Sequence, residues 1–313
     1  MILSGVLLLT GCSTQQTAQD SSAPPVTAYI QDSRQLYITE ATTAAQESQY
    51  KPINYTGQAA VWLPYTLFGD IMQGKTADEF RAAGVDRVVC VGYDAASSFA
   101  ARDISDRYEE VYFAAGIHPD GEREATKENL ARIKELCRHE KCVAVGEIGL
   151  DYHYEPFDKA GQTRAFLRQL ELAAEVSLPV SIHARDCTRD MLELLETNGA
   201  LLRRGFVMHC FSGSPGKAEQ FLKLGLYISF SGVLTFKNAR QAVETAAAVP
   251  HEKALIETDS PYMAPEPLRG KRNQPDYVLY VAQKLGEIWN ISPQEAARQT
   301  CLNAQTLFFG QQN

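Results

Sequence analysis

Short, continuously apolar runs alternate with amphipathic stretches from residue 86 onward, and this alternation constrains the fold most. Runs that are apolar throughout and rich in β-branched residues are typical of strands buried on both faces of a parallel sheet. They lie at 86–93, 111–118, 142–149, 179–184, 205–213, 226–232 and 253–260. The stretches between them have helical periodicity, as in 160–177, where Phe166, Leu170 and Ala174 are spaced four residues apart. The pattern predicts repeated strand–helix units.

Seven such units are visible, and eight would close a (β/α)8 barrel. The run 58–64 is the candidate for the missing first strand, although Pro64 is unfavourable inside a strand. We therefore expect an α/β fold of the TIM (β/α)8-barrel type over 76–313, with a first strand that is atypical or missing. The expected helices are 76–83, 96–107, 125–139, 160–177, 187–198, 215–224, 237–248, 275–288 and 292–308.

The N-terminal part differs in composition from this body. The stretch "LLLTGC", which ends at Cys12, follows an apolar run and resembles a bacterial lipoprotein signal with a lipidated cysteine. Residues 13–55 are rich in Ser, Thr, Gln, Ala and Pro, which is typical of a tether. We assign 1–20 to a lipoprotein signal with a lipid anchor at Cys12, and 21–75 to an extension or foreign segment. A chance apolar start is the alternative, because the first basic residue is Arg34, whereas signals begin with basic residues.

Charge and cysteine content narrow the class of protein. The net charge of −8 excludes a general electrostatic attraction to polyanions, so a nucleic-acid partner would need a local basic patch or metal ions. The seven cysteines lack zinc-knuckle spacing, which indicates a reduced, cytosolic-type body. No later apolar run approaches the roughly 20 residues that a membrane span requires, so no transmembrane span is expected.

Polar residues gather where the expected strands end. His118, Glu147, His183 and His209 end four of the strands, and Glu257 and Asp259 end the last. In a barrel the carboxyl ends of the strands meet at one face, where the βα loops build the active site. Imidazole nitrogens and carboxylate oxygens are the ligands expected for Zn²⁺, Mn²⁺ or Mg²⁺ in a hydrolase, and a carboxylate can bridge two ions. We therefore expect a hydrolytic site for one or two divalent ions.

Seven motifs carry a resemblance to a known family. They are "GIHP" (116–119), "GEIGLDYHY" (146–154), "SIHARD" (181–186), "HCFSGS" (209–214), "ISFSG" (228–232), "IETDSPYMAPEP" (256–267) and "RGKRNQP" (269–275). In order and spacing they resemble the TatD-like metal-dependent deoxyribonucleases, over about residues 76 to 310. The resemblance implies a TIM barrel that hydrolyses phosphodiester bonds of DNA, typically from the 3′ end, with one or two divalent ions (Mg, Mn or Zn). The implied partner is DNA, single-stranded or at 3′ ends; no stable protein partner is implied, and the family body is typically cytoplasmic.

The resemblance also implies roles for individual residues. Glu147 matches the bridging metal ligand, and His183 and His209 match ligands of the second ion. Asp259 matches a metal ligand that is also the candidate base for the attacking water. Glu147 and Asp259 are therefore the expected catalytic residues.

Substrate-binding and supporting residues are expected beside these ligands. Arg185 lies two residues after His183, and a guanidinium matches phosphate oxygens. His118 is expected to bind substrate in or beside the pocket, with the ordering of a loop as the alternative. Arg269 and Arg272 form a basic cluster suited to a DNA backbone, with a solvated loop as the alternative. The residues expected to support the ligands from behind are Asp151, His153 and Glu257.

One family feature is missing. The family begins with a His-x-His pair on its first strand, and this chain has no histidine before His118. The chain could be an enzyme with one ion held by Glu147, His183 and His209, or a barrel that has lost catalysis and persists as a binding or structural protein. It could also be a misjoined gene product. Amidohydrolase-type hydrolysis is the alternative chemistry, although such barrels usually bridge their metals with a lysine.

Overall fold

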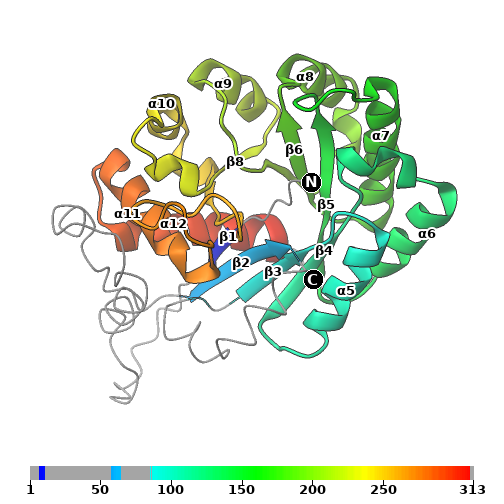
Figure 1. Cartoon of the computed structure of the whole chain (residues 1–313), viewed down its shortest axis with the longest axis horizontal. Coiled ribbons are helices and arrows are strands. Elements are labelled where there is room, and N and C mark those ends of the chain that lie inside the picture. Colours follow the sequence, from blue (N-terminus) through cyan, green and yellow to red (C-terminus); the bar gives the residue numbers. More distant parts are fainter. Residues whose placement is uncertain (1–6, 11–57, 65–84, 86, 311–313) are drawn as a thin grey trace.

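The computed structural model describes residues 7–10, 58–64, 85 and 87–310, and Figure 1 draws the others as a thin grey trace. The helix expected at 76–83 and the lipid-anchor candidate Cys12 lie outside the described residues. Within them, no helix combines the length and the apolar character needed to cross a membrane.

The described strands form one sheet in the order β1 to β9. From β2 onward all neighbouring strands are parallel, whereas β1 pairs antiparallel with β2. The strands are β1 Leu7–Thr10, β2 Gln58–Pro64, β3 Arg87–Val91, β4 Val111–Ala115, β5 Cys142–Asp151, β6 Val180–Arg185, β7 Phe206–Met208, β8 Tyr227–Phe230 and β9 Ala254–Ile256. The run expected as the first strand is therefore β2, and the described residues contain the eight parallel strands of a (β/α)8 pattern.

Helices surround the curled sheet on its outer side (Figure 1). They are α5 Ala95–Ser105, α6 Lys127–Leu136, α7 Lys159–Val176, α8 Thr188–Thr197, α9 Pro215–Lys223, α10 Arg240–Ala248, α11 Val278–Trp289 and α12 Pro293–Ala304. Shorter helical turns are η2 Pro119–Glu124, η3 Gly199–Leu201, η4 Gly232–Thr235, η5 His251–Lys253, η6 Pro275–Tyr277 and η7 Gln305–Phe309. Among the described strands, no pairing joins β9 to β1 or β2, so hydrogen bonds do not close the barrel there. The α/β TIM-type fold is confirmed.

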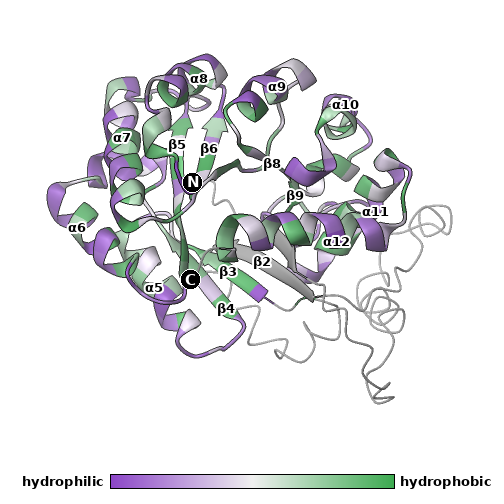
Figure 2. Cartoon of the chain, turned by 180° about the vertical axis from the view of Figure 1, so that it is seen from behind, coloured by the Kyte–Doolittle hydropathy of each residue, from purple (hydrophilic) through white to green (hydrophobic). Residues whose placement is uncertain are grey.

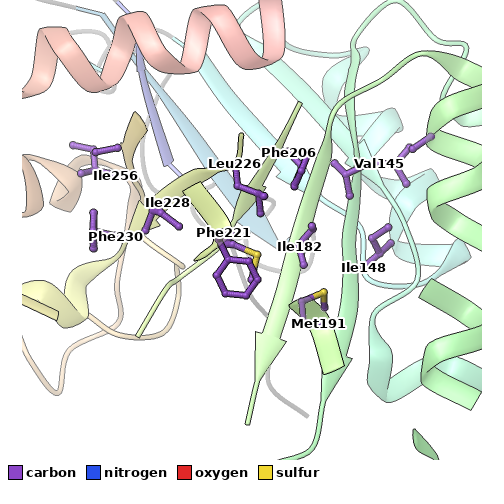
Figure 3. Close-up of a cluster of buried hydrophobic side chains, with 14 of the residues drawn as sticks. Val145, Ile148, Ile182, Met191, Phe206, Phe221, Leu226, Ile228, Phe230 and Ile256 are labelled. Atoms are coloured by element: carbon purple, nitrogen blue, oxygen red, sulfur yellow. The ribbon is translucent and has the colours of Figure 1, made fainter. Parts of the chain in front are cut away.

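Apolar side chains fill the space between sheet and helices. Every residue of β5 is buried, as the continuous apolar run predicts for a strand covered on both faces. Figure 2 shows apolar residues along the strands and hydrophilic residues on the outer surfaces of the helices. Figure 3 shows Ile182 of β6 near Met191 of α8 and Phe221 of α9, all members of one buried cluster. This packing fixes the relative positions of the strand ends, where the candidate site lies.

Strands β7 and β9 are shorter than the apolar runs at 205–213 and 253–260 that predicted them. Cys210 has a φ angle of 43° and Asp259 one of 57°, which take the backbone out of the extended region. The polar residues that follow each of these strands therefore lie in loops at the carboxyl edge of the sheet.

Candidate metal centre

One carboxylate oxygen lies at the centre of a histidine cluster at the strand ends. Oε1 of Glu147 is 2.6 Å from Nδ1 of His183 and 3.5 Å from Nε2 of His209. The same oxygen is 4.0 Å from Nε2 of His118. All four side chains are buried. The structure thus brings together four of the residues that the sequence singled out.

Two glycines allow β5 to approach β6 closely enough for these contacts. A Cβ on Gly146 would lie 2.8 Å from the Cβ of Ser181 on β6. A Cβ on Gly149 would lie only 1.9 Å from the carbonyl oxygen of His183. Because the backbone of β6 occupies that space, only glycine fits on either side of Glu147.

Both ring nitrogens of His183 have carboxylate partners. Nδ1 contacts Glu147, and Nε2 lies 3.0 Å from Oδ2 of Asp151, the last residue of β5. Burial acts to lower the pKa of His183, but the hydrogen bonds to Asp151 and Glu147 outweigh it and raise the pKa to about 9. In the metal-free protein, His183 is therefore an imidazolium at neutral pH.

His209 is held from its other side by a second carboxylate. Its Nδ1 lies 3.0 Å from Oε1 of Glu257, whose Oε2 accepts a hydrogen bond from the hydroxyl of Ser229. Burial acts to lower the pKa of His209, but the charges of Glu257 and Glu147 raise it to about 10. Glu257 is fully buried behind the ring, so this contact fixes which edge of His209 faces Glu147.

His118 differs from the other two histidines because it is neutral. Burial, together with repulsion from the charge of His183, lowers its pKa to about 3. Its Nδ1 accepts a hydrogen bond from the backbone N–H of Asp120 at 3.2 Å, so the single ring proton lies on Nε2. That nitrogen faces Glu147 and has no hydrogen-bond partner among the described residues. His118 therefore presents an N–H donor to the centre of the cluster.

Asp259 lies on the His209 side of the cluster. It is fully buried, and its charge contributes to the raised pKa of His209. Its backbone carbonyl accepts a hydrogen bond from the N–H of Tyr262 at 3.0 Å, which orders the turn after β9.

The donor atoms fit divalent metal ions. His118, Glu147 and His183 form one group whose donor atoms lie within 4.8 Å of one another, and His209, Cys210 and Glu257 form a second. Nitrogen and carboxylate oxygen suit Zn²⁺ and Mn²⁺, whereas burial raises the pKa of the Cys210 thiol and makes it a weak donor. Burial acts to raise the pKa of Glu147, but the charge of His209 and the hydrogen bond of His183 lower it to about 2. An ionised carboxylate between two imidazolium rings is a place where a divalent cation can replace two protons.

Other predicted residues lie at the rim of the cluster. The guanidinium of Arg185 lies 5.0 Å from the ring centre of Tyr154. Nδ1 of His153 lies 2.7 Å from Oδ2 of Asp186, while its backbone N–H donates to Oδ1 of Asp151 at 2.8 Å. His153 therefore contacts the site through its backbone, and its ring faces the loop after β6.

The basic cluster after β9 is exposed. Arg269 and Arg272 are both exposed. The guanidinium of Arg269 lies 4.2 Å from the ring centre of Phe236. These side chains belong to the surface loop, outside the buried histidine cluster.

Ser229 is a functional candidate that the sequence analysis missed. It is fully buried on β8 and bonds Glu257, which faces His209. A polar residue inside the apolar run 226–232 was the available signal, because a buried hydroxyl needs a hydrogen-bond partner.

A family model described as TatD related DNase matches residues 69–309, more than half of the chain. The chain belongs to this family. The TatD-related match agrees with the resemblance carried by the strand-end motifs, and it covers all four residues that meet in the buried cluster.

Individual relatives support the family assignment. A Bacillus subtilis protein named as an uncharacterised metal-dependent hydrolase, YabD, is 44% identical over 234 residues, which cover 75% of this chain and 91% of that protein. A Citrobacter rodentium protein named 3′-5′ ssDNA/RNA exonuclease TatD is 34% identical over 232 residues, covering 72% of this chain and 88% of that protein. The crystal structure of YjjV, a TatD homologue of Escherichia coli K12, matches with a TM-score of 0.71 and 29% identity, and covers 77% of this chain and 92% of that one. The chain is thus a TatD-family metal-dependent hydrolase by membership and by fold.

Proposed function

We propose that this chain hydrolyses phosphodiester bonds of single-stranded DNA from the 3′ end with the aid of a divalent ion. The observation that carries the proposal is the convergence of three buried histidines on one oxygen of Glu147. The name of the Citrobacter rodentium relative, a 3′-5′ ssDNA/RNA exonuclease, supports the choice of substrate.

The proposed metal ligands are Glu147, His183, His209 and Asp259. A divalent ion bound there would lower the pKa of a water and stabilise charge on a phosphate oxygen. Asp259 accepts the proton of the attacking water. Since no histidine precedes His118, one ion per chain is the stoichiometry that these ligands favour.

The neutral His118 is the proposed donor to the scissile phosphate. Its Nε2–H faces the centre of the cluster from a buried position, and a ring nitrogen that carries a proton has no lone pair with which to bind the metal. A hydrogen bond from a buried donor to an anionic oxygen is stronger than one in water.

A groove beside the cluster is the proposed path of the DNA strand. It has a volume of about 870 Å³, and its lining combines the ring of Phe211 with three cationic side chains and three acidic ones, which are Arg185, Arg189, Lys217, Asp186, Glu193 and Glu196. Cationic side chains next to an aromatic ring are the combination that single-stranded nucleic acids use for phosphates and bases. The exposed Arg269 and Arg272 are proposed to contact the DNA backbone outside the groove.

The test is an assay of the full chain on single-stranded DNA labelled at its 5′ end, with Mn²⁺ or Mg²⁺ and with a chelator as control. The proposal expects a ladder of products shortened from the 3′ end, and no products with the chelator. The same strand made of RNA distinguishes the two nucleic acids. Absence of cleavage by protein with a bound ion would remove the nuclease proposal, and turnover of a lactone or phosphotriester instead would favour amidohydrolase-type chemistry.

We further propose that a lipid at Cys12 anchors the chain to a membrane. The support is the "LLLTGC" stretch alone. Labelled palmitate incorporated by the wild-type chain and not by Cys12→Ser is the expected result, and equal labelling of both chains would contradict it.

A further inference from the structure

Helix α7 has two buried glutamines that bond the backbone at the carboxyl ends of the neighbouring strands β4 and β5. Gln162 and Gln169 are 2% and 1% exposed. They lie seven residues apart, which is about two helical turns, so both side chains leave the same face of the helix. Neither residue lies within the seven motifs quoted in the sequence analysis.

Gln162 binds both backbone groups of a single residue. Its Oε1 accepts the N–H of Asp151 at 2.9 Å, and its Nε2 donates to the carbonyl of Asp151 at 2.8 Å. Asp151 is the residue whose carboxylate lies 3.0 Å from Nε2 of His183. The amide of Gln162 therefore fixes the backbone from which the His183 partner extends.

Gln169 repeats this arrangement at the next strand end. Its Oε1 accepts the N–H of Ile117 at 2.8 Å, and its Nε2 donates to the carbonyl of Ile117 at 3.0 Å. Ile117 immediately precedes His118, whose own N–H donates to the carbonyl of Tyr93 at 2.8 Å. Gln169 therefore fixes the backbone that carries His118, whose Nε2 faces Glu147.

Glutamine suits this task for a chemical reason. Where a strand leaves the sheet, its buried N–H and C=O groups lose their neighbours and need other partners. One carboxamide supplies a donor and an acceptor together, whereas an ionised glutamate only accepts and a methionine of similar size does neither.

We propose that Gln162 and Gln169 are positioning residues with separate tasks: Gln162 sets metal affinity through Asp151 and His183, and Gln169 sets the reaction rate through His118. The task of Gln162 concerns metal binding alone, whereas the task of Gln169 rests on the proposed nuclease function. The geometry assigns the separation, because each glutamine bonds one strand end only.

The test compares Gln162→Met, Gln169→Met and Gln283→Met, the last a buried glutamine on α11 that serves as the matched control. Calorimetric titration with Mn²⁺ should show about tenfold weaker binding for Gln162→Met, since loss of a ligand's supporting partner costs ~10–100-fold. Gln169→Met and the control should bind Mn²⁺ like the wild type. With saturating metal, Gln169→Met should cleave DNA about tenfold more slowly, through kcat and not KM, because the donor to the scissile phosphate is displaced.

Equal losses of affinity and rate in both variants, or wild-type Mn²⁺ affinity in Gln162→Met, would overturn the proposal. If wild-type protein shows no nuclease turnover, the proposed function fails while the calorimetric comparison still decides the task of Gln162. If a methionine variant does not fold, hydrogen exchange of the wild type decides. The backbone amides of Asp151 and Ile117 should be as protected as those in the middle of β5. Fast exchange would contradict the hydrogen bonds from Gln162 and Gln169.

Discussion

His183 and His209 lie on neighbouring strand ends and share Glu147, yet they are held in different ways. His183 turns Nδ1 toward Glu147 and Nε2 toward Asp151, at the edge of an exposed loop. His209 turns Nε2 toward Glu147 and Nδ1 toward Glu257, inside the sheet. Both rings contact Glu147, but each has a second carboxylate of its own, which is Asp151 for His183 and Glu257 for His209.

The difference indicates which histidine is the more rigid ligand. Glu257 is fully buried and its second oxygen is bonded to Ser229, so water has no access to that pair. A carboxylate behind a histidine fixes the ring orientation and raises its basicity toward a metal on the other nitrogen. His209 therefore has the geometry of a pre-oriented ligand, whereas His183 must release one of its two carboxylate contacts before it can bind an ion.

Removing the negative charge of Glu147 should have the largest effect, because His183 and His209 both depend on it. In Glu147→Gln, both histidines lose the charge that raises their pKa, and the metal loses its central ligand. We expect Mn²⁺ affinity to fall by more than the ~100-fold upper end for an outer partner, and nuclease activity with it. Calorimetry and the DNA assay measure both quantities. Wild-type Mn²⁺ binding by this variant would remove Glu147 from the metal centre.

Acidification should weaken metal binding by up to ~100-fold per pH unit, because two protons must leave when an ion binds. The pKa values of His183 and His209 are raised to about 9 and about 10, so both rings hold protons at neutral pH. Titrations in buffers of different ionisation enthalpy count the protons released, and a count of zero would contradict the model of two charged rings.

The metal-free protein should respond to pH in the opposite sense. A pKa raised above the ordinary 6.5 contributes stability that is complete below pH 6.5 and is lost as pH rises through the folded-state values. We therefore expect the Tm of the metal-free chain to fall between pH 6.5 and about 9, while saturating Mn²⁺ reduces the fall. A metal-free Tm that rises over this interval would contradict the histidine assignments.

Replacing Asp151 or Glu257 with the corresponding amide tests the two histidines one at a time. Glu257→Gln should weaken Mn²⁺ binding by about 100-fold, and Asp151→Asn by about 10-fold, the upper and lower ends of the usual range for such partners. The reason for the order is that Asp151 lies next to an exposed loop that begins at His153, where water can approach the altered side chain, whereas Glu257 is fully buried inside the sheet. Calorimetry of both variants, with the exposed Glu219→Gln as control, tests the order, and a larger loss in Asp151→Asn would reverse the comparison.

Sequence analysis predicted the strand frame of this site and named Asp151 and Glu257 as supports, but it did not predict which histidine each carboxylate contacts. Continuous apolar runs located the parallel strands, and the strand-end rule then located Glu147, His183 and His209, because both depend on local pattern alone. The partner of each histidine depends on rotamers and on contacts between distant segments. Gln162 and Gln169 looked like ordinary polar residues of a helix, although both are buried, since sequence does not say which turn of α7 faces a strand end.

The smallest effect should come from Ser229→Ala, which keeps Glu257 but removes its hydroxyl partner. The freed carboxylate oxygen loses a buried hydrogen bond, so we expect a destabilisation of about 1–3 kcal/mol. Mn²⁺ affinity should fall less than ~10-fold, because Glu257 still faces His209. The matched control is Ser181→Ala: Ser181 is equally buried on β6, and its hydroxyl has no hydrogen-bond partner among the described residues. Urea unfolding and calorimetry should move in Ser229→Ala and stay unchanged in the control, because only Ser229 connects to the histidine that is held from inside the sheet. Equal effects in the two variants would mean that the Ser229 hydroxyl gives Glu257 no specific support.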